Sequence, residues 1–261
     1  MSRTVLTVHQ LSKDFGGVQA LDSLDLEVCA GEIVALIGPN GAGKTTFFNC
    51  LTGIYQPTRG EIFLHPPGQE NRKVCLNGLK INRITELGMA RTFQNVRLFP
   101  GLTSFENVLI GRHCRSKAFL FGAVFRDRAT RLEERKNREF SFALLKKIGI
   151  EVYADERAEN LPYGVQKRLE IARALATEPF LLLLDEPAAG LNPRETESLD
   201  RLITRLCREG LALLLIEHDM KLVMSLSDKV CVVDYGKKIA EGTPDQVRSD
   251  QKVIKAYLGE A

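Results

Sequence analysis

The segment GPNGAGKTT, residues 38–46, carries the most specific chemistry in this chain. It matches the pattern GxxxxGK[ST] and follows EIVALI, a continuous apolar run typical of a strand buried on both faces. Glycines let such a loop wrap closely, so that backbone N–H groups point inward at a helix N-terminus and bind phosphate. Lys44 adds a positive charge for the β- and γ-phosphates, and the Thr45 hydroxyl can ligate Mg²⁺. We therefore predict a nucleotide-phosphate site formed by Gly38, Pro39, Asn40, Gly41, Ala42, Gly43, Lys44, Thr45 and Thr46.

Two carboxylates follow a second apolar run in LLLLDE, residues 181–186. Asp185 is suited to hold Mg²⁺ through its water shell, and Glu186, which we expect to point to the other side, could polarise an attacking water. Strand ends also carry acidic residues for solubility alone. The nearby phosphate loop favours the catalytic interpretation.

Two further polar residues could complete this site. His218 follows a third apolar run, LALLLIE, and a lone histidine there is more often a satisfied polar group than a functional one. However, the carboxyl ends of parallel strands meet at one edge of a sheet, where His218 could hydrogen-bond the γ-phosphate. Gln94, in ARTFQNVRLF, has a side chain that can contact both Mg²⁺ and water, although one glutamine alone is a weak signal.

The three apolar runs predict a parallel sheet. Between the second and third runs, Leu199, Leu202, Ile203 and Leu206 share one helical face, and Gly210 is placed as a C-terminal stop. A strand, a helix and a strand in this order form a crossover unit. VLTVHQLS and SLDLEVCAGE alternate apolar and polar residues, as half-buried antiparallel strands do. KVCVVDYGKKIAEGTP predicts a hairpin, and a short tail helix is expected near QVRSDQKVIKAYLG.

The middle of the chain has a helical pattern instead. From about residue 100 to 160 it is dense in Arg and Lys, and Phe140, Leu144 and Ile148 recur at a spacing of four. The mixed charge run RDRATRLEERKNRE indicates a solvated helix face. LPYGVQKR, residues 161–168, is expected to lie just ahead of a helix formed by LEIARALA. HPPGQENRKVCLNG predicts a polar loop or an extended hairpin, to which we assign no function.

Composition excludes several classes of protein. The net charge of +3 over 261 residues is too slight to indicate a nucleic-acid partner. The six cysteines include no CxxC pair, as expected for reduced thiols in the cytoplasm. The N-terminus lacks the apolar core of a signal peptide, and the longest apolar run, AFLFGAVF at 118–125, falls short of the ~18 residues needed to cross a bilayer. We expect any membrane association to come through partners.

Taken in order, these motifs closely resemble those of the nucleotide-binding subunit of ATP-binding-cassette (ABC) transporters. The resemblance covers essentially the whole chain. RTFQNVRLFPGLTSFENVLIGRH, DEPAAGLNPRET and the ending IKAYLGEA are most similar to one ATPase subunit of bacterial branched-chain amino-acid importers. The resemblance implies an α/β P-loop NTPase (ABC ATPase) core over about residues 1–95 and 165–245, with an N-terminal antiparallel β subdomain. It also implies an inserted helical subdomain over about 96–164 and a tail over about 246–261.

The resemblance also implies roles for individual residues. Phe15 matches the aromatic residue that stacks on adenine, and Gln94 matches the loop glutamine that contacts Mg²⁺ and links the nucleotide site to the membrane subunit. Glu186 matches the general base, and His218 the switch histidine. LPYGVQ takes the place of the LSGGQ signature, which caps the γ-phosphate bound by the other subunit of a dimer. The contacting residues would be Pro162, Tyr163, Gly164, Val165 and Gln166.

This chain departs from the family pattern in its signature and near the dimer-contact loop. In the signature, Tyr163 replaces a glycine and Val165 replaces a glutamine. Pro162 replaces a serine whose hydroxyl and amide can both bind phosphate, and a proline supplies neither group. Losing one hydroxyl contact weakens γ-phosphate recognition by about 1–2 kcal/mol. A weaker composite site would be tolerable in a heterodimer of two unlike ATPases. Asn192 replaces an aspartate expected near the dimer-contact loop.

These features predict an ATPase that uses ATP and Mg²⁺ to drive uptake of branched-chain amino acids. Its expected partners are integral-membrane permease subunits, a sister ATPase subunit or a second copy of itself, and indirectly a periplasmic substrate-binding protein. It would lie on the cytoplasmic face of the inner membrane. Close alternatives are importers of urea or other amino acids and a lipopolysaccharide exporter. Two other classes fit less well. A soluble ABC-type ATPase acting on nucleic acid or ribosomes tends to carry two cassettes, and this chain has one. A P-loop GTPase or kinase is disfavoured because the chain has no NKxD motif.

Overall fold

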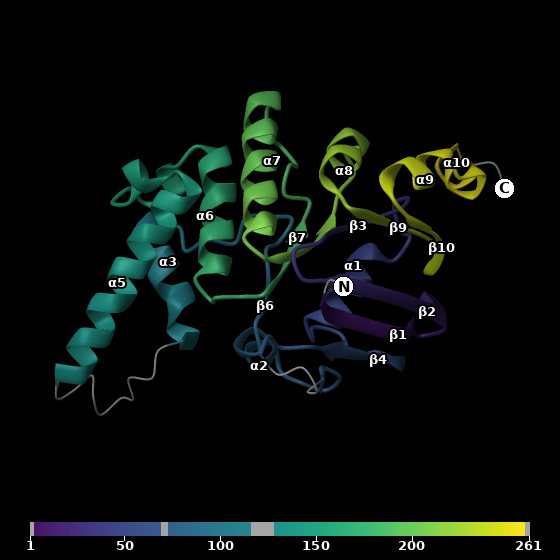
Figure 1. Ribbon diagram of the computed structural model, residues 1–261, viewed down its shortest axis with the longest axis horizontal. Coiled ribbons are helices and arrows are strands. Elements are labelled where there is room, and N and C mark those ends of the chain that lie inside the picture. Colours follow the sequence, from purple (N-terminus) through teal and green to yellow (C-terminus); the bar gives the residue numbers. More distant parts are fainter. Residues whose placement is uncertain (1–2, 69–72, 116–127, 259–261) are drawn as a thin grey trace.

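Two β-sheets pack through a shared apolar layer in the computed structural model, which describes residues 3–68, 73–115 and 128–258 (Figure 1). The first sheet is antiparallel, with four strands in the order β2-β1-β4-β5. Its strands are β1 (Thr4–Phe15), β2 (Val18–Cys29), β4 (Arg59–Leu64) and β5 (Val74–Cys75). The two alternating segments near the N-terminus therefore form antiparallel strands, as predicted, and the polar segment that follows β4 includes β5.

The second sheet has six strands in the order β10-β9-β3-β8-β7-β6, all parallel except β10, which forms a hairpin with β9. Every residue of β3, β7 and β8 is buried, which explains why these strands are continuous apolar runs. The strands are β3 (Ile33–Ile37), β6 (Met89–Arg91), β7 (Leu181–Asp185), β8 (Ala212–Ile216), β9 (Lys229–Asp234) and β10 (Lys237–Gly242). The predicted parallel sheet and C-terminal hairpin are confirmed.

Helices cover both faces of this parallel sheet. Alternate residues of β3 enter different cores: Ala35 packs with α7 (Pro193–Arg208), and Leu36 packs with Phe48 of α1 (Lys44–Leu51) and with the first sheet. This alternation follows from the two-residue period of a strand. It places α1 and α7 on opposite faces of the parallel sheet. The chemical motifs lie at the edge of the sheet where its parallel strands end.

A helical layer lies beside the sheet, on the left in Figure 1. It contains α3 (Ser104–Arg112), α5 (Arg128–Ile148) and α6 (Tyr163–Leu175), which pack against one another. The apolar run at 118–125 lies outside the described residues. Before the tail, the structure also has the helices α2 (Ile81–Glu86) and α8 (Met220–Leu226) and the short 3₁₀ turns η1 (His113–Arg115), η2 (Glu151–Tyr153) and η3 (Ala158–Asn160).

The start predicted for α6 was wrong. LPYGVQKR does not precede this helix, because Tyr163 is its first residue and Pro162 is its N-cap, with φ −54° and ψ 146°. The carbonyl of Pro162 accepts the N–H groups of Val165 and Gln166 at 2.9 and 3.0 Å. A proline is tolerated there because an N–H at this position has no partner within the helix. The expected subdomain boundary near residue 165 therefore falls inside a continuous helix.

The tail forms two short helices where one was expected, α9 (Pro244–Ser249) and α10 (Gln251–Leu258). Asp250 is extended and separates them. Across the described parts of the chain, none of the helices combines the length and the apolar character required to cross a bilayer.

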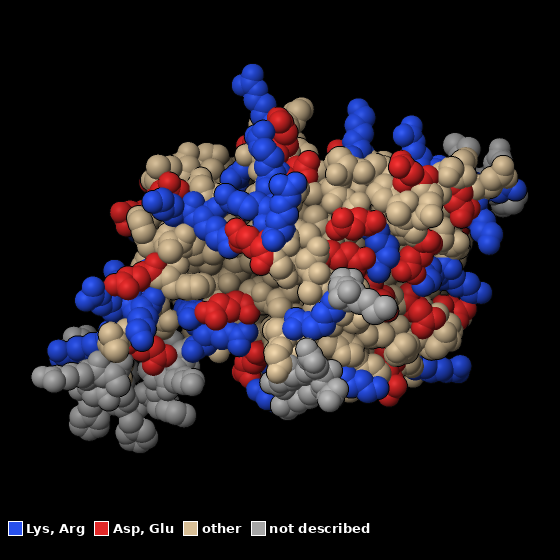
Figure 2. Space-filling view, viewed as in Figure 1, with Lys and Arg blue, Asp and Glu red and all other residues tan. Residues whose placement is uncertain are grey.

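Basic side chains gather over α6 and α7, with acidic ones among them (Figure 2). Two of these basic residues have a structural role. Arg168 donates to the carbonyl of Ile148 at 2.9 Å, and Arg205 donates to the carbonyl of Lys147. Both carbonyls lie at the C-terminus of α5, where cations stabilise a helix end.

Candidate nucleotide-hydrolysis site

The phosphate loop between β3 and α1 needs glycine at two positions. Gly38 has φ 153°, and a Cβ there would lie 2.0 Å from the carbonyl oxygen of Val233. Gly43 has φ 101°, and its Cβ would lie 2.5 Å from the carbonyl oxygen of Ala20. Neighbouring backbone therefore excludes any side chain at these places, so the loop closes tightly around the end of β3.

Lys44 is the first residue of α1 and turns back into the loop. Its side chain is buried, and Nζ donates to the carbonyls of Gly38 and Pro39 at 2.7 and 2.9 Å. Burial lowers the pKa of Lys44, while the carboxylates of Glu186 and Asp185 raise it. The cation is thus held inside the curve of the loop. Asn40, Gly41 and Thr45 are exposed on its rim, Pro39, Gly43 and Thr46 are half-buried, and Ala42 is buried.

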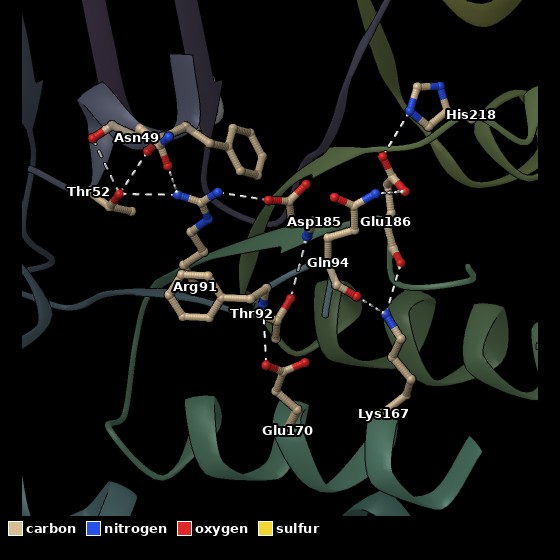
Figure 3. A network of polar contacts seen from close by, with 12 residues as sticks. Asn49, Thr52, Arg91, Thr92, Gln94, Lys167, Glu170, Asp185, Glu186 and His218 are labelled. Carbon is tan, nitrogen blue, oxygen red and sulfur yellow. Dashed lines mark hydrogen bonds and ion pairs between the residues drawn. The ribbon is translucent and has the colours of Figure 1, made fainter. Parts of the chain in front are cut away.

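Asp185 ends β7 in a buried ion pair with Arg91 of β6. The Nη2 of Arg91 lies 2.7 Å from Oδ2 of Asp185 (Figure 3). The other terminal guanidinium nitrogen, Nη1, donates to Oδ1 of Asn49 on α1 at 2.8 Å and to the hydroxyl of Thr52, the C-cap of α1, at 3.3 Å. One cation therefore joins the helix of the phosphate loop to the strand that carries the aspartate.

The oxygen donors around this loop fit Mg²⁺. Asp185 and Thr45 supply a carboxylate and a hydroxyl, and magnesium typically takes one or two protein oxygens and fills its other positions with water and phosphate. Among the described residues, no group of three or more His, Cys, Asp and Glu forms a cage for a metal. This sparse set suits magnesium better than zinc or calcium.

Glu186 follows β7 and is held by two other predicted site residues. Its Oε2 accepts from Nε2 of Gln94 at 2.8 Å, and its Oε1 lies 2.8 Å from Nε2 of His218 (Figure 3). Gln94 follows β6, and His218 follows β8. The structure therefore brings Glu186 and His218 together, as predicted for the ends of parallel strands, and it also places Gln94 against Glu186. The side chain of Glu186 is 16% exposed and that of His218 is 46% exposed, so solvent reaches the cluster.

Four charged residues that support this cluster were missed at the sequence level: Arg91, Lys167, Glu170 and Glu217. Glu170 accepts the N–H groups of Phe93 and Arg97 at 3.3 Å, on either side of Gln94. Each of the four is a charged residue within or next to a segment that is mainly apolar or helical in pattern. A charge in such a place is the signal that could have identified them. Their partners lie far away in sequence, so no local pattern identifies those partners.

Glu217 supports the loops after β7 and β8. It accepts from the N–H of Ala188 at 2.8 Å and from the N–H of His218 at 3.1 Å. Burial raises the pKa of Glu217, and these backbone bonds act in the opposite direction. The backbone that carries His218 is therefore tied to the turn that follows Glu186.

Phe15 ends β1 and is exposed. Its ring packs edge-on against Tyr55, with centroids 5.1 Å apart, and Nζ of Lys13 lies 4.8 Å from the ring centre. Tyr55 was not predicted. Phe15 is 41% exposed, and the stacking of its ring on a base stays a prediction.

The signature segment presents only part of itself to solvent. Tyr163 is 44% exposed, and its ring covers Gly190, where a Cβ would lie 2.9 Å from Cε1 of the ring. Val165 packs against the hydrophobic core, and the side-chain amide of Gln166 donates to the carbonyl of Leu161 at 2.9 Å. Fewer residues are therefore available to contact a partner's nucleotide than the predicted set from Pro162 to Gln166.

Asn192, the departure near the dimer-contact loop, has a structural role. Its side-chain oxygen accepts the N–H groups of Arg194 and Glu195, both at 3.0 Å, and so caps α7. The carboxylate of Glu195 also lies against Gly164, where a Cβ would be 2.5 Å from Oε1. Asparagine and aspartate are comparable N-caps, so this replacement preserves the start of α7.

The family model described as "ABC transporter" matches residues 21–189, which include the phosphate loop and both carboxylates. The chain belongs to the ABC transporter family. A second model, "Branched-chain amino acid ATP-binding cassette transporter", matches this ABC protein's tail at residues 237–261. Members of the family hydrolyse ATP to drive transport.

Relatives of this ABC ATPase match it along its length. The high-affinity branched-chain amino acid transport ATP-binding protein LivG of Escherichia coli K12 is 48% identical over 262 residues, covering 100% of both chains. The crystal structure of the ADP conformation of an ATP-binding cassette superposes with a TM-score of 0.82 at 29% identity, covering 99% of this chain and 100% of that one. A dimeric cassette in a post-hydrolysis state with ADP and Pi gives a TM-score of 0.74 at 25% identity, covering 92% and 98%.

Proposed function

We propose that this chain is the ATP-hydrolysing subunit of an importer of branched-chain amino acids. The observation that carries the proposal is the carboxylate of Glu186, held between Gln94 and His218 beside a phosphate loop. The branched-chain cargo is supported by the family model that matches the tail and by the 48% identity to LivG along the whole chain.

Nucleotide binding follows from the loop. The backbone N–H groups of residues 38–46 and the ammonium of Lys44 would bind the phosphates, and the exposed ring of Phe15 would stack on the base. Lys44 donates to two neutral loop carbonyls in this structure. A bound phosphate would take their place as a negatively charged acceptor. Such a charge-assisted bond is stronger than the neutral ones it replaces.

The residues that would hold magnesium are Thr45, Asp185 and Gln94. Bound there, Mg²⁺ would neutralise charge that develops on the phosphoryl oxygens during transfer. Arg91 keeps Oδ2 of Asp185 in one place, so the aspartate needs no rearrangement to present its other oxygen.

Hydrolysis would be an in-line attack by water on the γ-phosphorus. Glu186 takes a proton from the water, the water oxygen forms a bond to phosphorus, and the bond from phosphorus to the bridging oxygen of ADP breaks. Gln94 orients the water, because its amide already contacts the base. His218 shares the other carboxylate oxygen and is exposed enough to reach the γ-phosphate.

The working unit would be a dimer with a sister ATPase or with a second copy. The N-cap Pro162 and the first helical residues of α6, Tyr163 and Gly164, would face the ATP of the other subunit, with the positive end of the helix dipole behind them. Closure of such a dimer around ATP and its reopening after hydrolysis would drive the membrane subunits.

A hollow beside the segment after Gln94 would receive a cytoplasmic helix of a permease subunit. This cavity of about 530 Å³ lies where that segment, α3 and α6 meet. Its lining mixes apolar, basic and acidic side chains, including Phe93, Arg97, Leu98, Ile110, Glu170 and Arg173. Through this contact the ATPase would lie on the cytoplasmic face of the inner membrane, with a periplasmic substrate-binding protein as an indirect partner.

Purification of the tagged chain from membranes tests this proposal. We expect integral-membrane permease subunits to co-purify, and vesicles reconstituted with the complex to take up leucine, isoleucine or valine only when ATP is supplied. Uptake of urea, or of other amino acids alone, would reject the branched-chain cargo. Recovery without any membrane subunit would reject the transport role.

A further inference from the structure

Lys167 is a buried cation whose hydrogen-bond acceptors lie outside its own helix. It belongs to α6 and is 3% exposed. Its Nζ donates to the carbonyl of Gln94 at 2.9 Å and to the carbonyl of Glu186 at 3.2 Å (Figure 3). One side chain from the signature helix therefore contacts the backbone of both residues that would handle the attacking water.

The backbone of Glu186 needs such support. Its φ of 48° lies in the left-handed region, which is unfavourable for a residue with a Cβ and persists only where the surroundings hold it. Its N–H donates to the carbonyl of Ile216 at 2.9 Å, and its carbonyl accepts the N–H of Ala189 at 3.2 Å in addition to Lys167. Because φ sets the direction of the side chain, the bonds that hold this peptide also aim the carboxylate.

Lys167 lies on α6 directly after the signature residues, of which Pro162 is the N-cap and Tyr163 to Gln166 begin the helix. A helix moves as a rigid body over this distance, so a displacement of its first turn also moves Nζ of Lys167. We infer that Lys167 is a positioning residue that couples the placement of the signature segment to the aim of Glu186 and Gln94 in the same subunit. The inference rests on the proposed function, because the signature segment responds to nucleotide only if it meets the ATP of a second subunit.

If Lys167 only filled space in the core, an apolar side chain of similar length could replace it without loss of activity. Burying an ammonium against neutral carbonyls is unfavourable compared with burying an apolar side chain of similar length. Burial lowers the pKa of Lys167, and the carboxylates of Glu170, Glu217, Glu186 and Asp185 raise it. The substitution Lys167→Met keeps the length and removes the donor, so it separates positioning from packing.

The first experiment compares Lys167→Met with wild type in the complete transporter complex. The exposed lysine of α5, in Lys146→Met, is the matched control. We expect kcat to fall about tenfold or more, KM for ATP to change less than about threefold, and amide exchange at residues 184–186 and 188–190 to become faster. Wild-type kcat, or a lower kcat with unchanged exchange at these amides, would overturn the inference.

The second experiment tests the coupling itself. Gly164→Ala perturbs the first turn of α6, because its Cβ would lie 2.5 Å from Oε1 of Glu195. If Lys167 transmits this change, amide exchange around Glu186 is faster in Gly164→Ala than in wild type, and no faster in the double variant than in Lys167→Met alone. Unchanged exchange in Gly164→Ala, or increases that add in the double variant, would mean independent effects and would overturn the coupling.

Failure of the proposed function is distinguishable from failure of this inference. A wild-type complex that does not hydrolyse ATP, or one whose rate survives Glu186→Gln, would reject the proposed function and the inference with it. If both of those tests behave as proposed and Lys167→Met matches Lys146→Met, only the inference is rejected.

Discussion

The guanidinium of Arg91 lies 2.7 Å from Oδ2 of Asp185, and both side chains are only 6% exposed. Arg91 also contacts Phe48 and Phe93, whose ring centres lie 5.4 and 5.2 Å from its Cζ. Its Nε is buried without a hydrogen-bond partner among the described residues. A buried arginine left partly unsatisfied indicates that its position is set by the groups it joins, namely α1 and the carboxylate at the end of β7.

Replacing Arg91 with methionine should therefore damage both stability and magnesium use. Removal of one partner of a buried ion pair typically lowers the free energy of unfolding by about 3–5 kcal/mol. Chemical denaturation checks this value, and titration of nucleotide binding against Mg²⁺ should show a higher half-saturating concentration.

Asn49→Ala is the matched control, because it removes one anchor of Arg91 and leaves the pair with Asp185 intact. We expect it to lower the free energy of unfolding by about 1 kcal/mol without changing the Mg²⁺ requirement. An equal effect of both variants on the Mg²⁺ titration would contradict a specific role for the ion pair.

Glu186→Gln should retain ATP binding and lose turnover. The amide keeps a side chain of the same shape beside Gln94 and His218, but it cannot accept a proton from water. Loss of a general base lowers the rate by about 10²–10⁴-fold. Single-turnover hydrolysis and binding of a labelled ATP analogue measure the two properties separately, and a variant that turns over at the wild-type rate would remove Glu186 as the base.

Pro162→Ser should affect stability and hydrolysis through different contacts. A serine at this N-cap can accept an N–H of the first turn of α6, which typically stabilises a helix by about 1 kcal/mol. A hydroxyl turned toward a partner's phosphate should raise hydrolysis in the assembled complex. Thermal unfolding of the isolated chain and ATPase assays of the complex distinguish these roles. A gain in stability with no gain in rate would show that the missing hydroxyl does not limit the composite site.

Glu170→Gln should change the pH dependence of stability. Burial raises the pKa of Glu170 above its ordinary value of 4.5, although the N–H groups of Arg97 and Phe93 act in the opposite direction. An acid with a raised pKa in the folded state binds its proton more tightly there than when unfolded. Its contribution to stability is therefore full below 4.5 and is lost as the pH rises through the folded pKa.

Glutamine keeps an acceptor oxygen for the two backbone donors and has no charge to bury. The free energy of unfolding of Glu170→Gln should therefore increase relative to wild type as the pH rises above about 4.5. Urea denaturation of both proteins between pH 4.5 and 8 measures this difference. A difference that does not vary with pH would show that Glu170 titrates alike in the folded and unfolded chain.

Much of the site could be predicted from the sequence, because its chemistry lies in short contiguous motifs. Residues 38–46 encode a loop whose geometry follows from glycines and a following helix, and the carboxylates of Asp185 and Glu186 end an apolar run long enough to be a buried strand. Parallel strands bring such ends to one edge, so the approach of His218 to Glu186 followed from topology alone. The roles of Phe15 and the signature residues rest on family resemblance and stay predictions.

Only the tertiary structure decided which charges pair and where α6 begins. Arg91 lies 94 residues from Asp185 along the chain, and Lys167 lies 73 residues from Gln94. Such contacts depend on packing between separate elements, which no local periodicity encodes. Pro162 shows the same limit on a smaller scale: its residue type permits a loop or a helix start, and packing of the following residues against α3, α5 and the core selects the helix. The motifs alone therefore determined the chemistry available to this protein, and packing determined how its groups are aimed.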